Sequence, residues 1–565
     1  MGYTTSSRDT LVIRSIVVID GTGREPTGPM TVVIADGRIV AIQPDEVQTP
    51  SGAIEVDGTG RVLMPGLIET HAHYEDWMGE TLLLNGVTTI LDAAAVYPLP
   101  WTFAQQAGSR DGRIFGPRVL IAGPAIHGAS TAAQGASNYP RWAPLATQPG
   151  QARTAARALV ADGVDCLKAY MFLTPESIAE IAEVADEAGI PSLGHISVSA
   201  RAAARSGLRA IAHGSGLIQD VVPPEILARH DPLSVQLTRT LTPDWPNWFN
   251  LADDGLVDET IAELVELGTF LEPDMIHTGG RGGGLRAAEY DIEDREFFDD
   301  PRKEYIPAAF RAETTRYRTL YGWTALNADE LARARDGLAR LWAIYAEFHR
   351  RGGRLLIASG QGHLLPGVSM HRELELAVDI GLTPLEAIHA ATGRAAEYLR
   401  KPEIGVIAEG KLADLVILDG DPLEDIRATR SVAQVIQHGR LVEMEYHPWH
   451  ANPIASPPRE FNFGRGTPVI DELQPPASPA GDAVELTVVG RFFAPHSRVE
   501  IDGSPVPTRF VDEHHLVAAV PASVVAAAHL ARVVVVRPEP TEVRPVSDPA
   551  YWVITFATGG EEDAR

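Results

Sequence analysis

The sequence predicts an α/β protein whose central domain is a barrel of parallel strands, with smaller β domains at both ends of it. Short apolar strands alternate with amphipathic helical segments from about residue 66 to residue 403, which is the pattern of parallel βα units. Histidines and a lysine end several of these strands, and reacting groups gather at the carboxyl ends of barrel strands.

Composition limits the class of protein. The 565 residues exceed one ordinary core, so two or three domains are expected. Lys and Arg number 48 against 75 Asp and Glu, and the formal charge of -27 argues against nucleic acid or an anionic membrane as a partner. The one cysteine, Cys166, forms no internal disulfide, and neither a signal peptide nor a bilayer-spanning run is evident. We therefore expect a cytoplasmic protein.

The two flanks of the barrel are predicted to form one composite β-sandwich. Residues 1–65 contain short β-rich runs with turn signals at Asp20-Gly21 and Asp36-Gly37. Residues 404–446 return to short strands at 415–418 and 432–436.

The barrel, residues 66–403, contains the strand that ends at His71 and seven further strands. These are expected at residues 88–91, 118–122, 166–170, 191–195, 210–213, 269–272 and 355–358. Eight strands with intervening helices predict a TIM (β/α)8 barrel. Thr383 and Glu386 predict a capped helix start. The Gly-rich run 279–284 favours a mobile lid over a phosphate cradle.

Beyond the barrel, residues 447–466 are rich in Pro and polar residues and predict a linker. Residues 467–558 alternate apolar runs with turns, as in a β-sandwich, and carry no evident catalytic cluster.

A metal site is predicted where the barrel strands end. His71 and His73 project from one face of their strand, because side chains alternate with period two. Such a pair also occurs as two plain surface histidines near a turn. Lys168, His195 and His213 end the fourth, fifth and sixth strands and point to the same edge.

Lys168 adds a specific chemistry to this set. A lone lysine is commonly exposed or snorkelling, but one inside an apolar strand must find a charged partner or lose its proton. A neutral amine reacts with carbon dioxide, and the resulting carbamate has two oxygens that can bridge two cations.

The chain resembles the metal-dependent amidohydrolase superfamily, especially its imidazolonepropionase-like and prolidase-like branch. The likeness spans nearly all of residues 10–445 and rests on segments 65–73, 86–89, 194–195, 212–214, 371–376, 386–392 and 410–415, together with Lys168. It implies one metal on His71, His73 and Lys168 and a second on Lys168, His195 and His213. Two divalent ions, with zinc as the expected metal, and a carbamate on Lys168 follow from it.

The C-terminal residues look like an immunoglobulin-like module of the IPT/TIG type, on segments 489–495, 499–503 and 516–521. We interpret this module as a packing or oligomerisation element, and we expect a homo-oligomer.

One departure from the family concerns its catalytic acid. The family ends its eighth strand in an aspartate that binds metal and takes the proton of water, and our alignment puts Gly360 there with no acidic residue nearby. His363 and His277 are candidate proton shuttles, although each is also explained as a plain loop histidine. Tyr170 shares the face of Lys168 and is a candidate substrate contact or barrel filling.

The leading hypothesis is a hydrolase that activates water against a C–N bond of an amide, small peptide or cyclic amide, with a small-molecule substrate. Two alternatives remain open. A site without the aspartate would suit a metal-dependent isomerase, lyase or cyclase, and a protein that lost its base would be a non-catalytic binding protein.

Overall fold

A computed structural model describes residues 2–6, 9–44, 50–95, 97–128, 143–230, 245–278, 286–307, 310–311, 314, 328–360, 364–449, 452–457, 468–491, 493, 497–512, 514–536 and 550–555. The chain forms two compact units, of which the first comprises residues 1–129 and 141–459 and the second includes the C-terminal part from residue 460.

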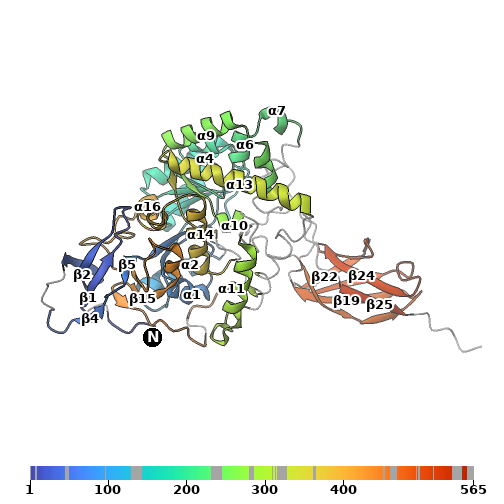
Figure 1. The fold of residues 1–565 in the computed structure, drawn as a ribbon. Helices are drawn as coiled ribbons and strands as arrows, with labels where there is room; N and C mark the ends of the chain where they lie inside the picture. Colours follow the sequence, from blue (N-terminus) through green and yellow to red (C-terminus); the bar gives the residue numbers. More distant parts are fainter. Residues whose placement is uncertain are drawn as a thin grey trace, which may run out of the picture. The chain divides into compact units, whose positions relative to one another are not determined.

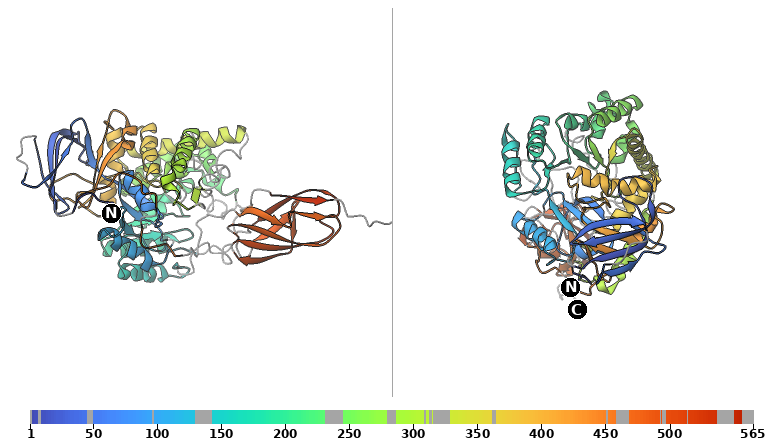
Figure 2. Two further views of the ribbon diagram at one scale, coloured as in Figure 1. Left: turned by 90° about the horizontal axis from the view of Figure 1, so that it is seen from below. Right: turned by 90° about the vertical axis from the view of Figure 1, so that its left-hand side faces the viewer.

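The two flanks of the barrel pair in one sheet, as the sequence predicts (Figures 1 and 2). Strand β5 pairs antiparallel with β14, so that Leu63 lies opposite Ile417. Hydrogen bonds connect all the described strands of this domain. The order is β16-β15-β14-β5-β1-β2-β3, with β4 beside β1. The strands are β1 (Leu11–Val18), β2 (Thr27–Ala35), β3 (Arg38–Pro44), β4 (Ile54–Asp57), β5 (Val62–Pro65), β14 (Leu415–Leu418), β15 (Val432–Gln437) and β16 (Arg440–Leu441).

Local turn chemistry explains much of this sheet. Asp36 and Gly37 both have positive φ, 50° and 75°, which is the conformation of the tight turn predicted between β2 and β3. Ser15 has a φ of 55° and divides β1, whose first half pairs with β4 and whose end pairs with β5. Asp20-Gly21 lies in the longer connection from β1 to β2 and forms no tight hairpin.

The eight predicted barrel strands are all present, in two parallel sheets. One sheet has the order β6-β7-β8 and the other β13-β12-β11-β10-β9. They are β6 (Leu67–Ala72), β7 (Val87–Asp92), β8 (Arg118–Ile121), β9 (Leu167–Ala169), β10 (Ser192–Gly194), β11 (Ala210–Ala212), β12 (Phe270–Glu272) and β13 (Arg354–Leu355). Ile126, which follows β8, exchanges backbone hydrogen bonds with Lys168 of β9 and with Tyr170, which comes directly after β9. The described residues show no ladder from β13 to β6.

Helices connect these strands (Figure 1). The predicted capping box is formed: the Thr383 side chain accepts from the Glu386 backbone, and the Glu386 side chain accepts from the Thr383 backbone. Across the described residues, no helix combines the length and apolarity needed to cross a membrane. The helices are α1 (Met78–Leu84), α2 (Leu99–Arg110), α3 (Gln151–Asp162), α4 (Pro175–Glu187), α5 (Ala200–Arg205), α6 (Leu217–Val221), α7 (Pro224–Leu227), η1 (Trp245–Leu251), α9 (Asp254–Glu266), α10 (Met275–Thr278), α11 (Ala287–Asp299), η2 (Pro301–Lys303), α13 (Ala328–Arg350), α14 (Val368–Asp379), α15 (Pro384–Ala390), α16 (Gly393–Tyr398) and η4 (Ile426–Arg430).

Part of the predicted linker is attached to the barrel. The Trp101 indole N–H donates to Ala455 O at 3.0 Å, and the Gln105 amide donates to Ile454 O at 2.8 Å. Residues 452–457 therefore belong to the first unit.

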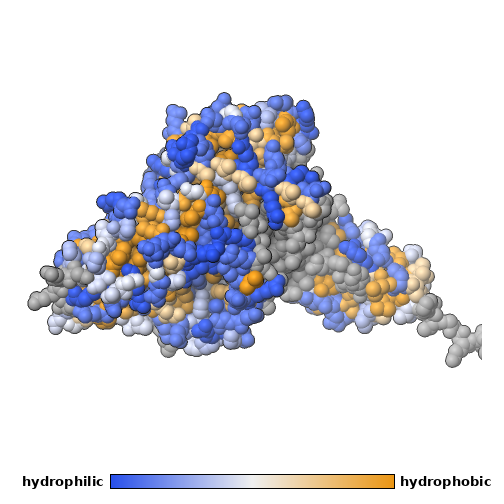
Figure 3. Space-filling view, viewed as in Figure 1, coloured by the Kyte–Doolittle hydropathy of each residue, from blue (hydrophilic) through white to orange (hydrophobic). Residues whose placement is uncertain are grey.

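The C-terminal unit is the predicted β-sandwich (Figure 2). Its sheets have the orders β17-β19-β23-β22 and β18-β25-β24-β20-β21. A core that includes Leu486, Ile501 and the fully buried Trp552 fills the unit. Apolar side chains also reach its visible surface (Figure 3), and Leu530 is 58% exposed. The strands are β17 (Val469–Gln474), β18 (Ala477–Pro479), β19 (Val484–Arg491), β20 (Arg498–Ile501), β21 (Ser504–Val506), β22 (Thr508–Asp512), β23 (His515–Val520), β24 (His529–Val536) and β25 (Ala550–Thr555).

Candidate metal centre

The predicted metal-binding side chains lie where neighbouring parallel strands end. Lys168 is in β9, and His195 and His213 directly follow β10 and β11. Strand β10 lies between β9 and β11: Lys168 of β9 pairs with Leu193, and Gly194 pairs with Ile211 of β11. This register places the carboxyl ends of the three strands next to one another. The sequence pattern therefore places these groups at one edge, as expected for parallel strands.

All five predicted side chains come together in space. Lys168 Nζ lies 3.3 Å from His71 Nε2. The ring centroid of His71 lies 5.6 Å from that of His73 and 4.5 Å from that of His213. The His195 and His213 centroids are 4.7 Å apart. The four imidazoles thus form a continuous cluster, and the Lys168 amine contacts it at His71.

Burial changes the chemistry of Lys168, which is 1% exposed and does not snorkel. Burial lowers the pKa of its ammonium, and the nearby Glu272 and Asp274 oppose this effect. A lowered pKa increases the fraction of neutral, nucleophilic amine.

Two carboxylates that the sequence interpretation did not assign complete the cluster. Glu272 is the last residue of β12 and Asp274 follows two positions later. The sequence Glu272-Pro273-Asp274 places two acidic residues at the end of a predicted barrel strand. That position alone identifies both as candidate metal ligands or catalytic groups.

Glu272 orients His71. Its Oε1 lies 2.5 Å from His71 Nδ1, and its Oε2 accepts a 2.6 Å hydrogen bond from the Thr70 hydroxyl. A carboxylate on one ring nitrogen fixes the tautomer and leaves the other nitrogen as a ligand. His73 has the same arrangement, since its Nδ1 lies 3.2 Å from Ala94 O.

Asp274 is placed as a ligand or base. Its Oδ2 lies 2.6 Å from His213 Nδ1 and 3.7 Å from His71 Nδ1. The side chain is fully buried, and apart from this contact of Oδ2 with His213 the described residues offer its two oxygens no hydrogen bond. The ligand atoms of His71, His213 and Asp274 all lie within 4.8 Å of one another. A buried carboxylate with one oxygen on His213 and the other unpaired, beside a second imidazole, fits a divalent cation.

Backbone strain marks the same place. His213 and Asp274 both have positive φ, 60° and 46°. Non-glycine residues in this conformation cost free energy and persist where surrounding contacts hold them, commonly at functional sites.

The sequence around Gly360 contains no acidic residue, but a carboxylate from a distant segment lies beside its neighbour. Ser359, the preceding residue, donates through its hydroxyl to Glu69 Oε2 at 2.5 Å. Burial raises the pKa of Glu69 to about 7, while hydrogen bonds from Ser359 and His71 oppose the increase. Glu69 belongs to β6, far from Ser359 in sequence, and therefore escapes a local search.

The candidate catalytic residues are only partly described. The Tyr170 ring lies 5.0 Å from that of His195, edge to face. His277 lies in α10, but its side chain is outside the described residues, as are His363 and the Gly-rich run 279–284. Cys166 is buried, which raises the pKa of its thiol to about 12 and supports a packing role.

Comparison with known proteins identifies related families. The amidohydrolase family matches residues 62–442, and the IPT/TIG domain matches residues 468–545. An allantoinase of Streptomyces avermitilis is 37% identical over 92 residues, which is 14% of this chain and 20% of that protein. An imidazolonepropionase of Pyrobaculum arsenaticum is 55% identical over 53 residues, 9% of this chain and 13% of that protein. These alignments thus span a fifth or less of each relative's length.

A solved structure covers much more of the chain. The Xaa-Pro dipeptidase with bound methionine superposes with a TM-score of 0.55 at 19% identity, over 77% of this chain and 100% of that chain. At this identity the likeness concerns the fold of the barrel and its flanking sheet.

Proposed function

We propose that this chain, which belongs to the amidohydrolase family, is a metal-dependent hydrolase that cleaves a C–N bond with water. The observation that carries the proposal is the convergence of four histidines, Lys168 and the buried Asp274 at the strand ends. Structural cores rarely collect so many polar groups without a ligand, because each unsatisfied buried group is costly.

In this proposal His71, His73 and Lys168 hold one divalent ion, and Lys168, His195 and His213 hold a second. Imidazole nitrogens and carboxylate oxygens suit zinc, which is the proposed metal. When bound, such ions lower the pKa of water and polarise a carbonyl group.

Lys168 is proposed to act as its carbamate. The neutral amine nitrogen attacks the carbon of carbon dioxide, forms a C–N bond and releases a proton, which leaves an anion with two ligand oxygens. The lowered pKa of the buried Lys168 supports this role, because it favours the reactive neutral amine.

Asp274 is proposed to replace the aspartate absent at Gly360. Burial and the charge of Glu272 hold the pKa of Asp274 well above its usual range, so its carboxylate is a stronger base than an exposed one. It would take a proton from the attacking water and deliver it to the leaving nitrogen. Glu272 is occupied by Thr70 and His71, and it serves to orient His71.

The proposal also covers the substrate, the closure of the barrel, the C-terminal module and the compartment. The names of the allantoinase, imidazolonepropionase and Xaa-Pro dipeptidase support a small amide, dipeptide or cyclic amide as substrate. We propose that Tyr170 contacts it beside His195. We also propose that the two parallel sheets are arcs of one closed barrel, that the C-terminal module mediates homo-oligomerisation, and that the protein is cytoplasmic.

A second candidate function rests on Gly360, which lacks the family's acid. A metal-dependent isomerase, lyase or cyclase needs no hydrolytic proton shuttle, and a non-catalytic binding protein needs none either. Asp274 favours hydrolysis over these alternatives, because it supplies a carboxylate from the neighbouring strand end.

The test combines metal removal with labelled water. Purified protein is assayed on a panel of small amides, dipeptides and cyclic amides in ¹⁸O-water, before and after chelation and after zinc is restored. We expect a product carboxylate that contains the label, loss of turnover with chelator and recovery with zinc. Turnover without label incorporation would instead support the isomerase or lyase, and full activity of the chelated protein would contradict a metal-dependent reaction.

A further inference from the structure

Helix α14 contacts the turn that carries Asp274. Glu373 of this helix is 1% exposed, and its Oε1 accepts a 2.5 Å hydrogen bond from the backbone N–H of Ile276. The backbone of Met275 also bonds to this carboxyl group. Glu373 thus holds the two residues that directly follow Asp274.

The strained backbone conformation of Asp274 requires contacts from other segments to stabilise it. Asp274 has a φ of 46°, and its side chain has one close contact among the described residues, that of Oδ2 with His213 Nδ1, which does not fix the backbone of the turn. A strained non-glycine conformation persists only when neighbouring groups determine it. The hydrogen bonds to Glu373 act on the backbone immediately next to the strained residue.

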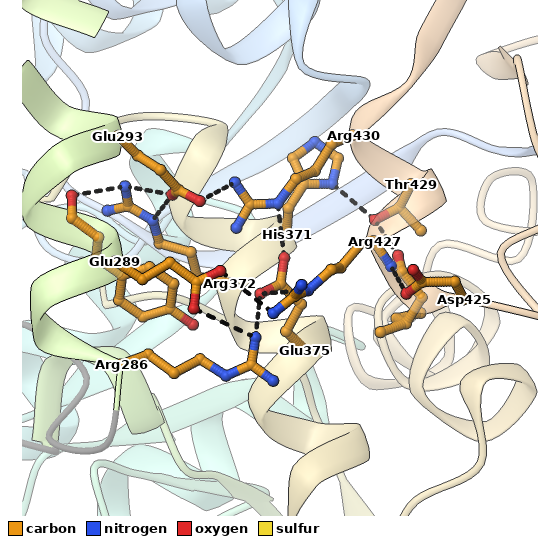
Figure 4. Close-up of polar contacts among 12 residues, drawn as sticks. Arg286, Glu289, Glu293, His371, Arg372, Glu375, Asp425, Arg427, Thr429 and Arg430 are labelled. Atoms are coloured by element: carbon orange, nitrogen blue, oxygen red, sulfur yellow. Dashed lines mark hydrogen bonds and ion pairs between the residues drawn. The ribbon is translucent and has the colours of Figure 1, made fainter. Parts of the chain in front are cut away.

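Helix α14 is itself anchored on both sides of Glu373. Arg372 is 2% exposed and pairs with Glu293 at 2.8 Å and with Asp294 at 2.7 Å, both on α11. Glu375 pairs with Arg286 at 2.9 Å and with Arg430 at 2.6 Å. Figure 4 shows these side chains of α14 directed toward α11 and η4. Residues on both sides of Glu373 therefore attach α14 to α11 and η4 and fix the position of Glu373.

We infer that Glu373 is a positioning residue for the metal centre: it holds the turn after β12 so that the Asp274 carboxylate faces His71 and His213. The inference rests on the proposed metal-dependent function. It assigns a role to part of the 371–376 segment, which the proposed chemistry does not otherwise use.

The experiment compares the same substitution at two buried positions of α14. Glu373→Asp keeps the carboxyl group but withdraws it by one methylene from Ile276, and Glu375→Asp does the same at a carboxyl that pairs with Arg286 and Arg430. Glu373→Gln keeps the length and an acceptor oxygen. Zinc affinity is measured by competition with a chromophoric chelator, together with kcat and KM and a circular dichroism check of folding.

We expect Glu373→Asp to weaken zinc binding by about 10- to 100-fold, the usual effect of losing a group that orients a ligand. Glu373→Gln should bind zinc like the unaltered protein, and Glu375→Asp should lose thermal stability without losing zinc affinity. Equal affinity in Glu373→Asp and the unaltered protein, or equal losses at both positions, would overturn the inference. Absence of zinc binding by the unaltered protein would instead contradict the proposed function.

A second measurement uses the unaltered protein, in case Glu373→Asp does not fold. Amide hydrogen exchange at Met275 and Ile276 should be slow in the chelated protein, because both N–H groups bond to a buried carboxyl group. Rapid exchange there, with slow exchange in β12, would also overturn the inference.

Discussion

Replacement of Asp274 by asparagine should lower activity and raise the stability of the metal-free protein. The side chain is fully buried near Glu272, Glu373 and Glu69, and burial with these charges raises its pKa well above the ordinary value of 3.8. Asparagine has nearly the same shape but no charge. It removes both the proposed base and the repulsion.

The pH dependence of stability gives the magnitude. The unfolded chain loses the Asp274 proton near pH 3.8, whereas the folded chain keeps it to higher pH. Between these two values the folded state binds one more proton, so the free energy of unfolding falls by about 1.4 kcal/mol per pH unit as pH rises. The asparagine variant lacks this contribution, and its advantage over the unaltered protein should grow from about pH 4 upward.

Two assays check the prediction. Urea unfolding of chelated protein at several pH values should show the growing advantage of Asp274→Asn. With zinc present, kcat/KM should fall by about 10²- to 10⁴-fold, which corresponds to about 3–5 kcal/mol of transition-state stabilisation. Asp220→Asn is a matched control, since Asp220 is buried with a raised pKa but hydrogen-bonds to Ser199 and the Arg201 backbone. Unchanged turnover in Asp274→Asn, or a steeper loss of its stability with pH, would refute the reasoning.

Three further predictions concern other parts of the first unit. Arg372→Met should cost about 3–5 kcal/mol in the free energy of unfolding, because it leaves the buried Asp294 without its 2.7 Å partner; a urea midpoint like that of the unaltered protein would contradict this. Burial lowers the pKa of His371 from the ordinary 6.5 to about 3. Between pH 6.5 and pH 3, therefore, the unfolded chain has a protonated imidazole and the folded chain has a neutral one. Stability from this group is present above pH 6.5 and is lost as pH falls toward 3; His371→Asn should reduce that slope in urea titrations. Gly360→Asp should not raise kcat/KM, because Asp274 already supplies a carboxylate and the φ of 63° at Gly360 disfavours a side chain; a rise in hydrolysis would remove Asp274 from the proposed role.

The parallel strands and the convergence of the five predicted metal-binding side chains were predictable from local patterns. Strand and helix periods differ, so alternating runs locate the strands, and parallel strands bring their carboxyl ends to one edge. Lys168 and His195, separated by a whole helix in sequence, lie at the ends of neighbouring strands for that reason. Thr383 likewise carries its own capping signal.

The remaining features depend on contacts between distant segments. Asp274 reaches the histidines through a strained turn and a helix almost a hundred positions later, neither of which has a local signature. The contact of Ser359 with Glu69 joins the segment that follows β13 to β6. The attachment of residues 452–457 was missed because backbone carbonyls such as Ala455 O accept hydrogen bonds whatever the side chain is. Composition cannot report such contacts.

The pairing of β5 with β14 has a consequence for synthesis of the protein. Leu63 leaves the ribosome early, but its partner Ile417 emerges only after the entire barrel has been translated. At roughly 5–20 residues per second, this delay is on the order of tens of seconds. During that time β5 has an open edge, which is a template for wrong pairing with other chains. Expression should therefore benefit from chaperones that shield nascent strands, and truncation before β14 should give an aggregation-prone product.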